Sequence, residues 1–167
     1  MGSPTCSYLR SSTKSLLENL AHYIHNKFPD RPDRRLWVGD ACPSSGNCSG
    51  HPGGSHSGGR KCDINYYTHD NTNCTQYGAM KGMKVVPVCD GNTVTKHFDW
   101  ERNYYFIKKL YEMTNNRRSR TCDAIKEHIT KQLKTNDEKN SWFKMLTSDP
   151  GSKYMHNMHY HLELEIL

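Results

Sequence analysis

The feature that most constrains this 167-residue chain is the strict alternation of polar and apolar residues from His159 to Ile166. Successive side chains of a β-strand point to opposite faces, so the alternation predicts a strand with two different faces. The polar face carries His159, His161, Glu163 and Glu165, and the apolar face carries Tyr160, Leu162, Leu164 and Ile166. The fold must therefore pack a core on one side of this strand, and it holds two histidines on a rigid element on the other.

Periodic blocks of apolar residues predict the other elements. A helix is expected over 11–28, with Ser12 or Thr13 as its cap and with a four-residue spacing of Leu16, Leu20, Ile24 and Phe28. Further helices are expected at 100–113, 124–134 and 137–147, and further strands at 36–38, 62–67 and 84–88. Because the two kinds of element do not alternate regularly, we expect an α+β fold with a small, mostly antiparallel sheet flanked by helices.

Caps and loops complete this outline. Asp99 is expected to cap the helix at 100–113 and Asp123 the helix at 124–134. The inward faces would be Trp100, Tyr104, Ile107 and Tyr111 in the first, and Ile125, Ile129 and Leu133 in the second. The basic run Arg117, Arg118 and Arg120 is interpreted as an exposed helix end. A long loop rich in Gly, Ser, Pro and Cys is expected at 39–61, and loops of this length are uncommon unless they are functional. A second, polar loop is expected at 68–83.

Length and charge limit the domain organisation and the partners. A chain of 167 residues suits one domain, which we place at 11–167, after a tag or disordered segment at 1–10. The formal net charge of +6 favours anionic partners, such as nucleic acid, a membrane surface or a bacterial cell wall, or else only supplies solubility. No interleaved basic and aromatic motif of a known nucleic-acid-binding fold is present, so no nucleic-acid partner is expected.

Seven cysteines are many for a chain of this size, and they indicate an exported protein with disulfides. Their pairing is open, with Cys42–Cys48 and Cys74–Cys89 as loop-local possibilities. No two cysteines have the close spacing of a structural zinc site. No apolar stretch is long enough for a transmembrane helix. From the cysteine count, a secreted or periplasmic protein is expected.

The histidines point to a metal site. His56 and Asp63 are separated by a spacer containing Gly58 and Gly59, which lets the backbone turn between them. If the strand that begins near Asp63 pairs with the last strand, His56, Asp63 and His161 can meet at one point. Two imidazoles and a carboxylate leave a fourth position for water, as catalytic zinc requires, with His159 beside it as a proton acceptor or oxyanion stabiliser.

These segments resemble the penicillin-insensitive murein endopeptidases. That family belongs to the wider group of lysostaphin-type enzymes, D-Ala-D-Ala metallopeptidases and hedgehog-like domains, whose zinc motif is His, six residues, Asp, and later His-x-His. The resemblance covers 36–67 and 153–165. It is carried by the residues Gly39-Asp40, Gly50-His51, Ser55-His56, Asp63, His156, His159 and His161.

The resemblance implies one zinc ion per chain, bound by His56, Asp63 and His161, with His159 as the catalytic histidine. His156 would be a further catalytic or substrate-contacting residue, and His51 would contact substrate. Apart from the resemblance, Arg60 is a basic residue close to the loop, and we expect it to contact a carboxylate-bearing substrate or else only to supply charge. The implied activity is hydrolysis of the D-Ala to diaminopimelate cross-link of peptidoglycan. The alternatives are a zinc-containing binding module without catalysis, and a zinc D,D-carboxypeptidase or dipeptidase of the same group.

Overall fold

The computed structural model describes residues 9–31, 36, 38–41, 60–69, 89–90, 93–114, 118–133, 135, 146–147 and 159–164. Three predicted features lie wholly or mostly outside these residues: the strand at 84–88, both long loops, and the helix at 137–147. The helices are α1 (Ser11–Lys27), α2 (Trp100–Met113) and α3 (Asp123–Gln132). The strands are β1 (Val38–Ala41), β2 (Lys61–Asn65), β3 (Cys89–Asp90), β4 (Thr93–Val94), β5 (Arg118–Arg120), β6 (Leu146–Thr147) and β7 (His159–Glu163).

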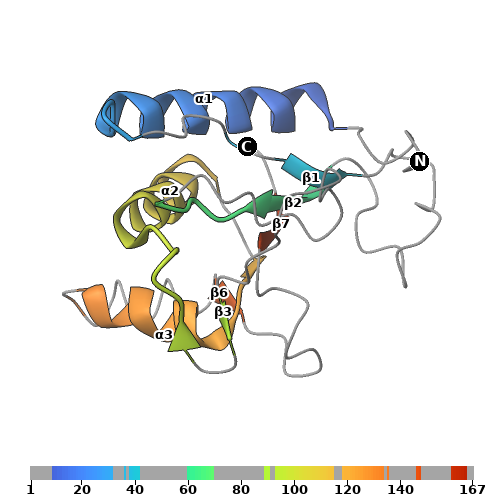
Figure 1. The fold of residues 1–167 in the computed structure, drawn as a ribbon. Coiled ribbons are helices and arrows are strands. Elements are labelled where there is room, and N and C mark those ends of the chain that lie inside the picture. Colours follow the sequence, from blue (N-terminus) through green and yellow to red (C-terminus); the bar gives the residue numbers. More distant parts are fainter. Residues whose placement is uncertain are drawn as a thin grey trace, which may run out of the picture.

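One sheet organises the structure, with the strand order β1-β2-β7-β5-β6. Neighbouring strands are antiparallel except for the parallel pair β5–β6, and β3 and β4 form a separate antiparallel pair. Figure 1 shows α1, α2 and α3 one below the other, with β2 and β7 beside α2. The predicted α+β single domain with a small, mostly antiparallel sheet is confirmed.

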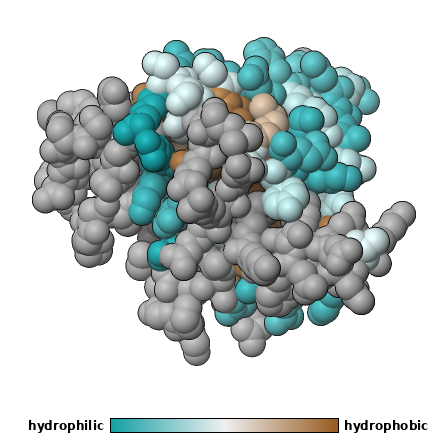
Figure 2. Space-filling model, turned by 180° about the vertical axis from the view of Figure 1, so that it is seen from behind, coloured by the Kyte–Doolittle hydropathy of each residue, from teal (hydrophilic) through white to brown (hydrophobic). Residues whose placement is uncertain are grey.

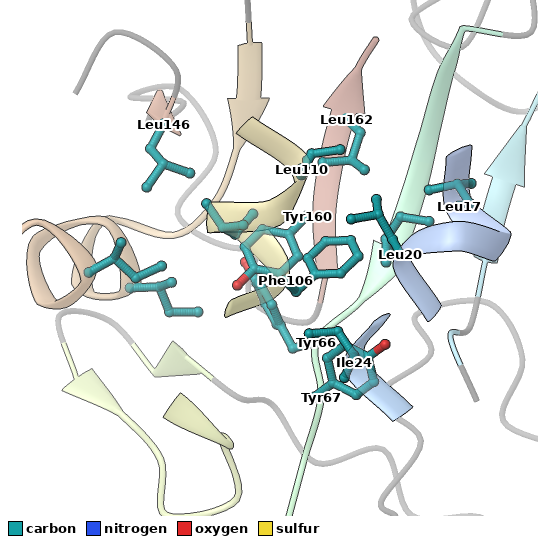
Figure 3. Packing of buried hydrophobic residues seen from close by; sticks show 14 of the residues in the cluster. Leu17, Leu20, Ile24, Tyr66, Tyr67, Phe106, Leu110, Leu146, Tyr160 and Leu162 are labelled. Atoms are coloured by element: carbon teal, nitrogen blue, oxygen red, sulfur yellow. The ribbon is translucent and has the colours of Figure 1, made fainter. Parts of the chain in front are cut away.

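The hydrophobic core lies between the helices and one face of this sheet (Figure 3). The two central strands contribute the fully buried side chains of Cys62, Ile64, Tyr160 and Leu162. From α2, Phe106 stacks on Tyr160 with ring centroids 5.9 Å apart, and from α1, Leu20 packs into the same cluster. Burying one such side chain stabilises the fold by about 1.5–3 kcal/mol. The predicted apolar face of the last strand is therefore confirmed where the structure describes it.

Helix α1 has the predicted extent and the predicted apolar stripe. Leu16, Leu20 and Ile24 are buried. The predicted cap is wrong, because the N-cap residue is Arg10 and it makes no side-chain cap hydrogen bond. Ser12 and Thr13 lie inside the first turn, where Thr13 is buried.

Helix α2 is fixed to the end of β2 by buried polar groups. The Asp99 carboxylate caps the helix as predicted, accepting from the Arg102 backbone N–H at 3.0 Å and from Arg102 Nε at 2.7 Å. The Asn103 side chain accepts from the Tyr67 N–H at 3.1 Å and donates to the Tyr67 carbonyl at 2.8 Å. It also donates to the Asp99 carbonyl at 2.7 Å. These bonds join two segments far apart in the sequence.

The predicted buried face of α2 is wrong in part. Ile107 is buried, but Trp100 and Tyr104 are half-buried and Tyr111 is 37% exposed. The residues that take their place are Arg102, Asn103, Phe106 and Leu110. Periodicity of apolar residues missed this face because two of its members are polar and are buried by their hydrogen bonds to Tyr67, Thr68 and Asp99.

Two other predictions near the C-terminal half need correction. The basic run is not a helix end: Arg118–Arg120 is strand β5, which pairs with β7 and buries Ser119 opposite Leu162. Leu146 and Thr147 are not helical, because they form β6 and pair with β5. In both places, pairing with a strand distant in sequence decides the conformation over the local pattern.

Helix α3 begins one residue earlier than predicted. Cys122 is its N-cap, and Asp123 lies in the first turn, where a carboxylate interacts favourably with the helix dipole. Ile125, Ile129 and Leu133 are buried as predicted.

The outer surface fits the low mean hydropathy of −0.91. In the view from behind (Figure 2), hydrophilic residues cover most of the described surface, and hydrophobic atoms appear only in a small area. Among the described residues, no helix is long and apolar enough to cross a membrane.

We expect Asn103→Ala to lower the free energy of unfolding by about 2–4 kcal/mol, because it leaves the buried Tyr67 backbone groups without these partners. Denaturation in urea measures this change. Glu112→Ala, on the exposed side of the same helix, is the matched control and should change stability by less than about 0.5 kcal/mol. Equal effects of the two substitutions would show that Asn103 does not anchor α2.

Candidate functional site

The site is built by the pairing of β2 with β7. Their register places Asp63 directly opposite His161, Asn65 opposite His159 and Lys61 opposite Glu163. Directly opposed residues of an antiparallel pair share a face. Because Cys62, Ile64, Tyr160 and Leu162 face the helices, these six residues line the opposite face of the sheet.

Three side chains converge on this face. The Nδ1 of His161 lies 2.9 Å from Oδ1 of Asp63, a hydrogen bond in which the imidazole donates because a carboxylate can only accept. The Nε2 of His159 lies 3.5 Å from Oδ2 of the same carboxylate. Asp63 is therefore held between two imidazoles that come from one strand.

The cluster is buried, so the Asp63 carboxylate depends on its two imidazole partners. Asp63, His159 and His161 are 5%, 6% and 4% exposed. An ionised carboxylate so far from water is stable only with hydrogen bonds or an opposite charge. The strand register supplies both imidazoles as partners, without any need for a flexible loop to bring them there.

A charged rim borders the cluster. Oε1 of Glu163 lies 3.9 Å from Nε2 of His161, 3.6 Å from Nζ of Lys61 and 3.7 Å from Nη2 of Arg120. Arg120 reaches this position because β5 pairs with β7 and sets it opposite His161. The rim thus combines one carboxylate with two cations next to the buried imidazole.

The 2.9 Å between His161 Nδ1 and Asp63 Oδ1 is the length of a hydrogen bond. Ligand atoms on a tetrahedral zinc ion lie about 3.3 Å apart, so these two atoms could both ligate zinc only after Nδ1 loses its proton and the pair opens slightly. Within the described ranges, no group of three or more His, Cys, Asp or Glu side chains is arranged to hold a metal. A zinc site at Asp63 and His161 would therefore include a ligand outside the described residues, the role that the sequence predicts for His56.

The structure brings together only part of the predicted set. Asp63, His159 and His161 meet, whereas His51, His56 and His156 lie outside the described residues. Arg60 is exposed, and its carbonyl accepts from the Leu164 N–H at 2.9 Å, which closes the end of the β2–β7 pair. Its predicted contact with substrate stays a prediction.

From the sequence, Lys61 is expected only as a basic residue close to the loop, and Arg120 only as part of an exposed helix end, so neither is predicted beside Glu163. Lys61 could have been found by extending the predicted strand by one residue, which places it opposite Glu163. Arg120 had no usable signal, because a three-residue strand of sequence Arg-Ser-Arg contains no β-branched or aromatic residue.

Cys62 lies behind the site as a free thiol in the core. Burial, with a smaller contribution from the charge of Asp63, raises the pKa of this thiol to about 12. A thiol that stays protonated at neutral pH is a poor nucleophile, so Cys62 acts as a packing residue. Cys122 is disulfide-bonded.

In comparisons with protein-family models and with curated proteins, no family model and no curated protein matches this chain. The resemblance to murein endopeptidases therefore stays a prediction, carried by the motif residues alone.

A double-mutant cycle tests the contact between Asp63 and His161 without any metal. With both residues changed to Ala, singly and together, and with chelator present, we expect a coupling energy of about 1–3 kcal/mol in urea unfolding. The same cycle on the exposed pair Lys14–Glu18 of α1 is the control and should give at most about 0.5 kcal/mol. A coupling at Asp63–His161 no larger than the control would contradict the paired site.

The raised pKa of Cys62 gives a second prediction. In the native protein, its alkylation at pH 8 should be slower than that of an unfolded sample by at least about tenfold, as read from the mass of the Cys62 peptide. Because the folded state favours the protonated thiol, this contribution to stability is complete below the ordinary pKa of 9.0 and is lost as the pH rises towards 12. Equal labelling rates of the folded and unfolded protein would contradict the burial of this thiol.

Proposed function

We propose that this protein is a zinc-dependent endopeptidase that hydrolyses peptide cross-links of bacterial peptidoglycan. One observation supports this most: the β2–β7 register sets Asp63 and His161 as partners, with His161 Nδ1 and Asp63 Oδ1 2.9 Å apart on the polar face of the sheet. These are two of the three ligands in the motif, and His56 would complete the set.

The proposed chemistry divides between the metal and one histidine. Zinc, when bound, lowers the pKa of a water to about 7 and polarises the carbonyl of the substrate. His159, whose Nε2 lies 3.5 Å from Asp63, would accept a proton from the attacking water or stabilise the developing oxyanion. Asp63 and His161 would hold their orientation because both belong to the same hydrogen-bonded strand pair.

The substrate is proposed from resemblance and charge. The D-Ala to diaminopimelate bond follows from the murein endopeptidase motifs, and the net charge of +6 suits an anionic wall polymer. The disulfide at Cys122 fits a secreted or periplasmic location, because disulfides persist in oxidising compartments.

Three substitutions separate the proposed roles. We expect Asp63→Ala and His161→Ala to lose stoichiometric zinc and all hydrolysis, because each removes a ligand. His159→Ala should keep the zinc and lose hydrolysis by at least about a hundredfold, since only proton transfer is removed. Zinc is measured by elemental analysis of the dialysed protein, and hydrolysis by mass spectrometry of products from cross-linked muropeptides.

His22→Ala on α1 is the control and should retain both zinc and activity. Full activity of His159→Ala would contradict the role of that residue. Zinc bound at one per chain without release of any muropeptide would instead favour the binding module. Release of a terminal D-Ala alone would favour the carboxypeptidase.

A further inference from the structure

A cleft of about 360 Å³ lies between α2 and α3. Its lining includes Trp100, Glu101, Tyr104 and Tyr105 from α2 and His128 and Gln132 from α3. This volume lies in the lower part of the range for ligand sites, about 300–1,000 Å³. The half-buried rings form the walls, and the exposed Glu101 and Gln132 bring hydrogen-bonding groups to the opening.

The aromatic wall is held in place by ring contacts. Trp100 stacks on His128, with centroids 3.3 Å apart and an interplanar angle of 27°. Phe98 meets the indole edge-on at 4.6 Å, and Tyr104 and Tyr105 meet edge-on at 5.3 Å. A ligand would therefore meet a preformed surface, which lowers the entropy cost of binding.

Charged groups beside this cleft already have contacts within the chain. Glu101 pairs with Arg31 at 3.4 Å, and Nζ of Lys27 lies 3.9 Å from the centre of the Tyr105 ring. Desolvation, with a smaller contribution from Lys131, lowers the pKa of His128, so its imidazole is neutral at pH 7. A cationic ligand would have to compete with Arg31 for the carboxylate and with Lys27 for the ring. An uncharged ligand fits this surface better.

We infer that the cleft binds an uncharged sugar ring of a glycan strand. This choice of ligand rests on the proposed function, in which the substrate is peptidoglycan. Aromatic rings contact the apolar C–H face of a pyranose, while Gln132 and Glu101 can bond its hydroxyl or acetamido groups. The helices cover the face of the sheet opposite to Asp63 and His161. A glycan held between α2 and α3 would thus not contact Asp63 or His161.

Calorimetric titration with a short soluble oligomer of β-1,4-linked N-acetylglucosamine tests this inference on the whole chain. The wild-type protein should bind the oligomer, and Trp100→Ala and Tyr104→Ala should each weaken binding by roughly tenfold or more. Gln132→Ala, an exposed position that does not threaten folding, should also weaken it. Tyr111→Ala, on α2 but outside the cleft, is the matched control and should bind like the wild type. No binding, or equal binding by all variants, would overturn the inference.

A second arm identifies the source of the sugar. Peptide-free glycan strands of peptidoglycan should bind as well as the oligomer, whereas binding to the chitin-type oligomer alone would overturn the assignment to the wall.

Tyr104→Ala should slow product release from intact sacculi but leave hydrolysis of a sugar-free cross-linked peptide unchanged. If no substrate is hydrolysed but the oligomer still binds, the proposed function fails and the cleft assignment holds. If the sugar-free peptide is hydrolysed but no sugar binds, only the cleft assignment fails.

Discussion

The antiparallel pairing of β2 with β7 is the constraint on which both the core and the candidate site depend. Its register sets Cys62 against Leu162 and Ile64 against Tyr160 on the helix-facing side, and Asp63 against His161 on the other. A slip of one residue would turn the apolar side chains away from the helices and bury the polar ones. Burial of the apolar face therefore fixes the register that brings Asp63 and His161 together.

The helices support this register from behind the site. Asn103 holds the backbone of Tyr67, just beyond β2, and Phe106 packs on Tyr160 of β7, so α2 contacts both strands of the central pair. The buried Tyr66 hydroxyl lies 2.8 Å from Thr121 Oγ1, which ties the end of β2 to the segment before α3. The polar face is thus carried on a layer whose other side is densely packed, as suits a site that must hold its donor atoms in place.

The sequence predicted what depends on local periodicity. The alternation after His159 gave the two faces of the last strand, and the spacing of Leu16, Leu20 and Ile24 gave α1. The meeting of Asp63 with His161 was predicted on the condition that the strand near Asp63 pairs with the last strand, and β2 does pair with β7. It could not predict β5 or β6, since their conformation comes from pairing with distant strands. The buried face of α2 was not predicted for a related reason. Arg102 and Asn103 are buried because they form hydrogen bonds with Asp99 and Tyr67, and a pattern of apolar residues does not indicate such bonds.

We propose that Asp63 and His161 bind zinc through oxygen and nitrogen, in a chain with seven cysteines of which Cys122 is disulfide-bonded. X-ray absorption at the zinc edge of the metal-loaded protein identifies these ligand atoms. We expect a first shell of nitrogen and oxygen alone, at about 2.0–2.1 Å, and its loss in Asp63→Ala. A sulfur ligand at about 2.3 Å, or an unchanged spectrum in that variant, would contradict it.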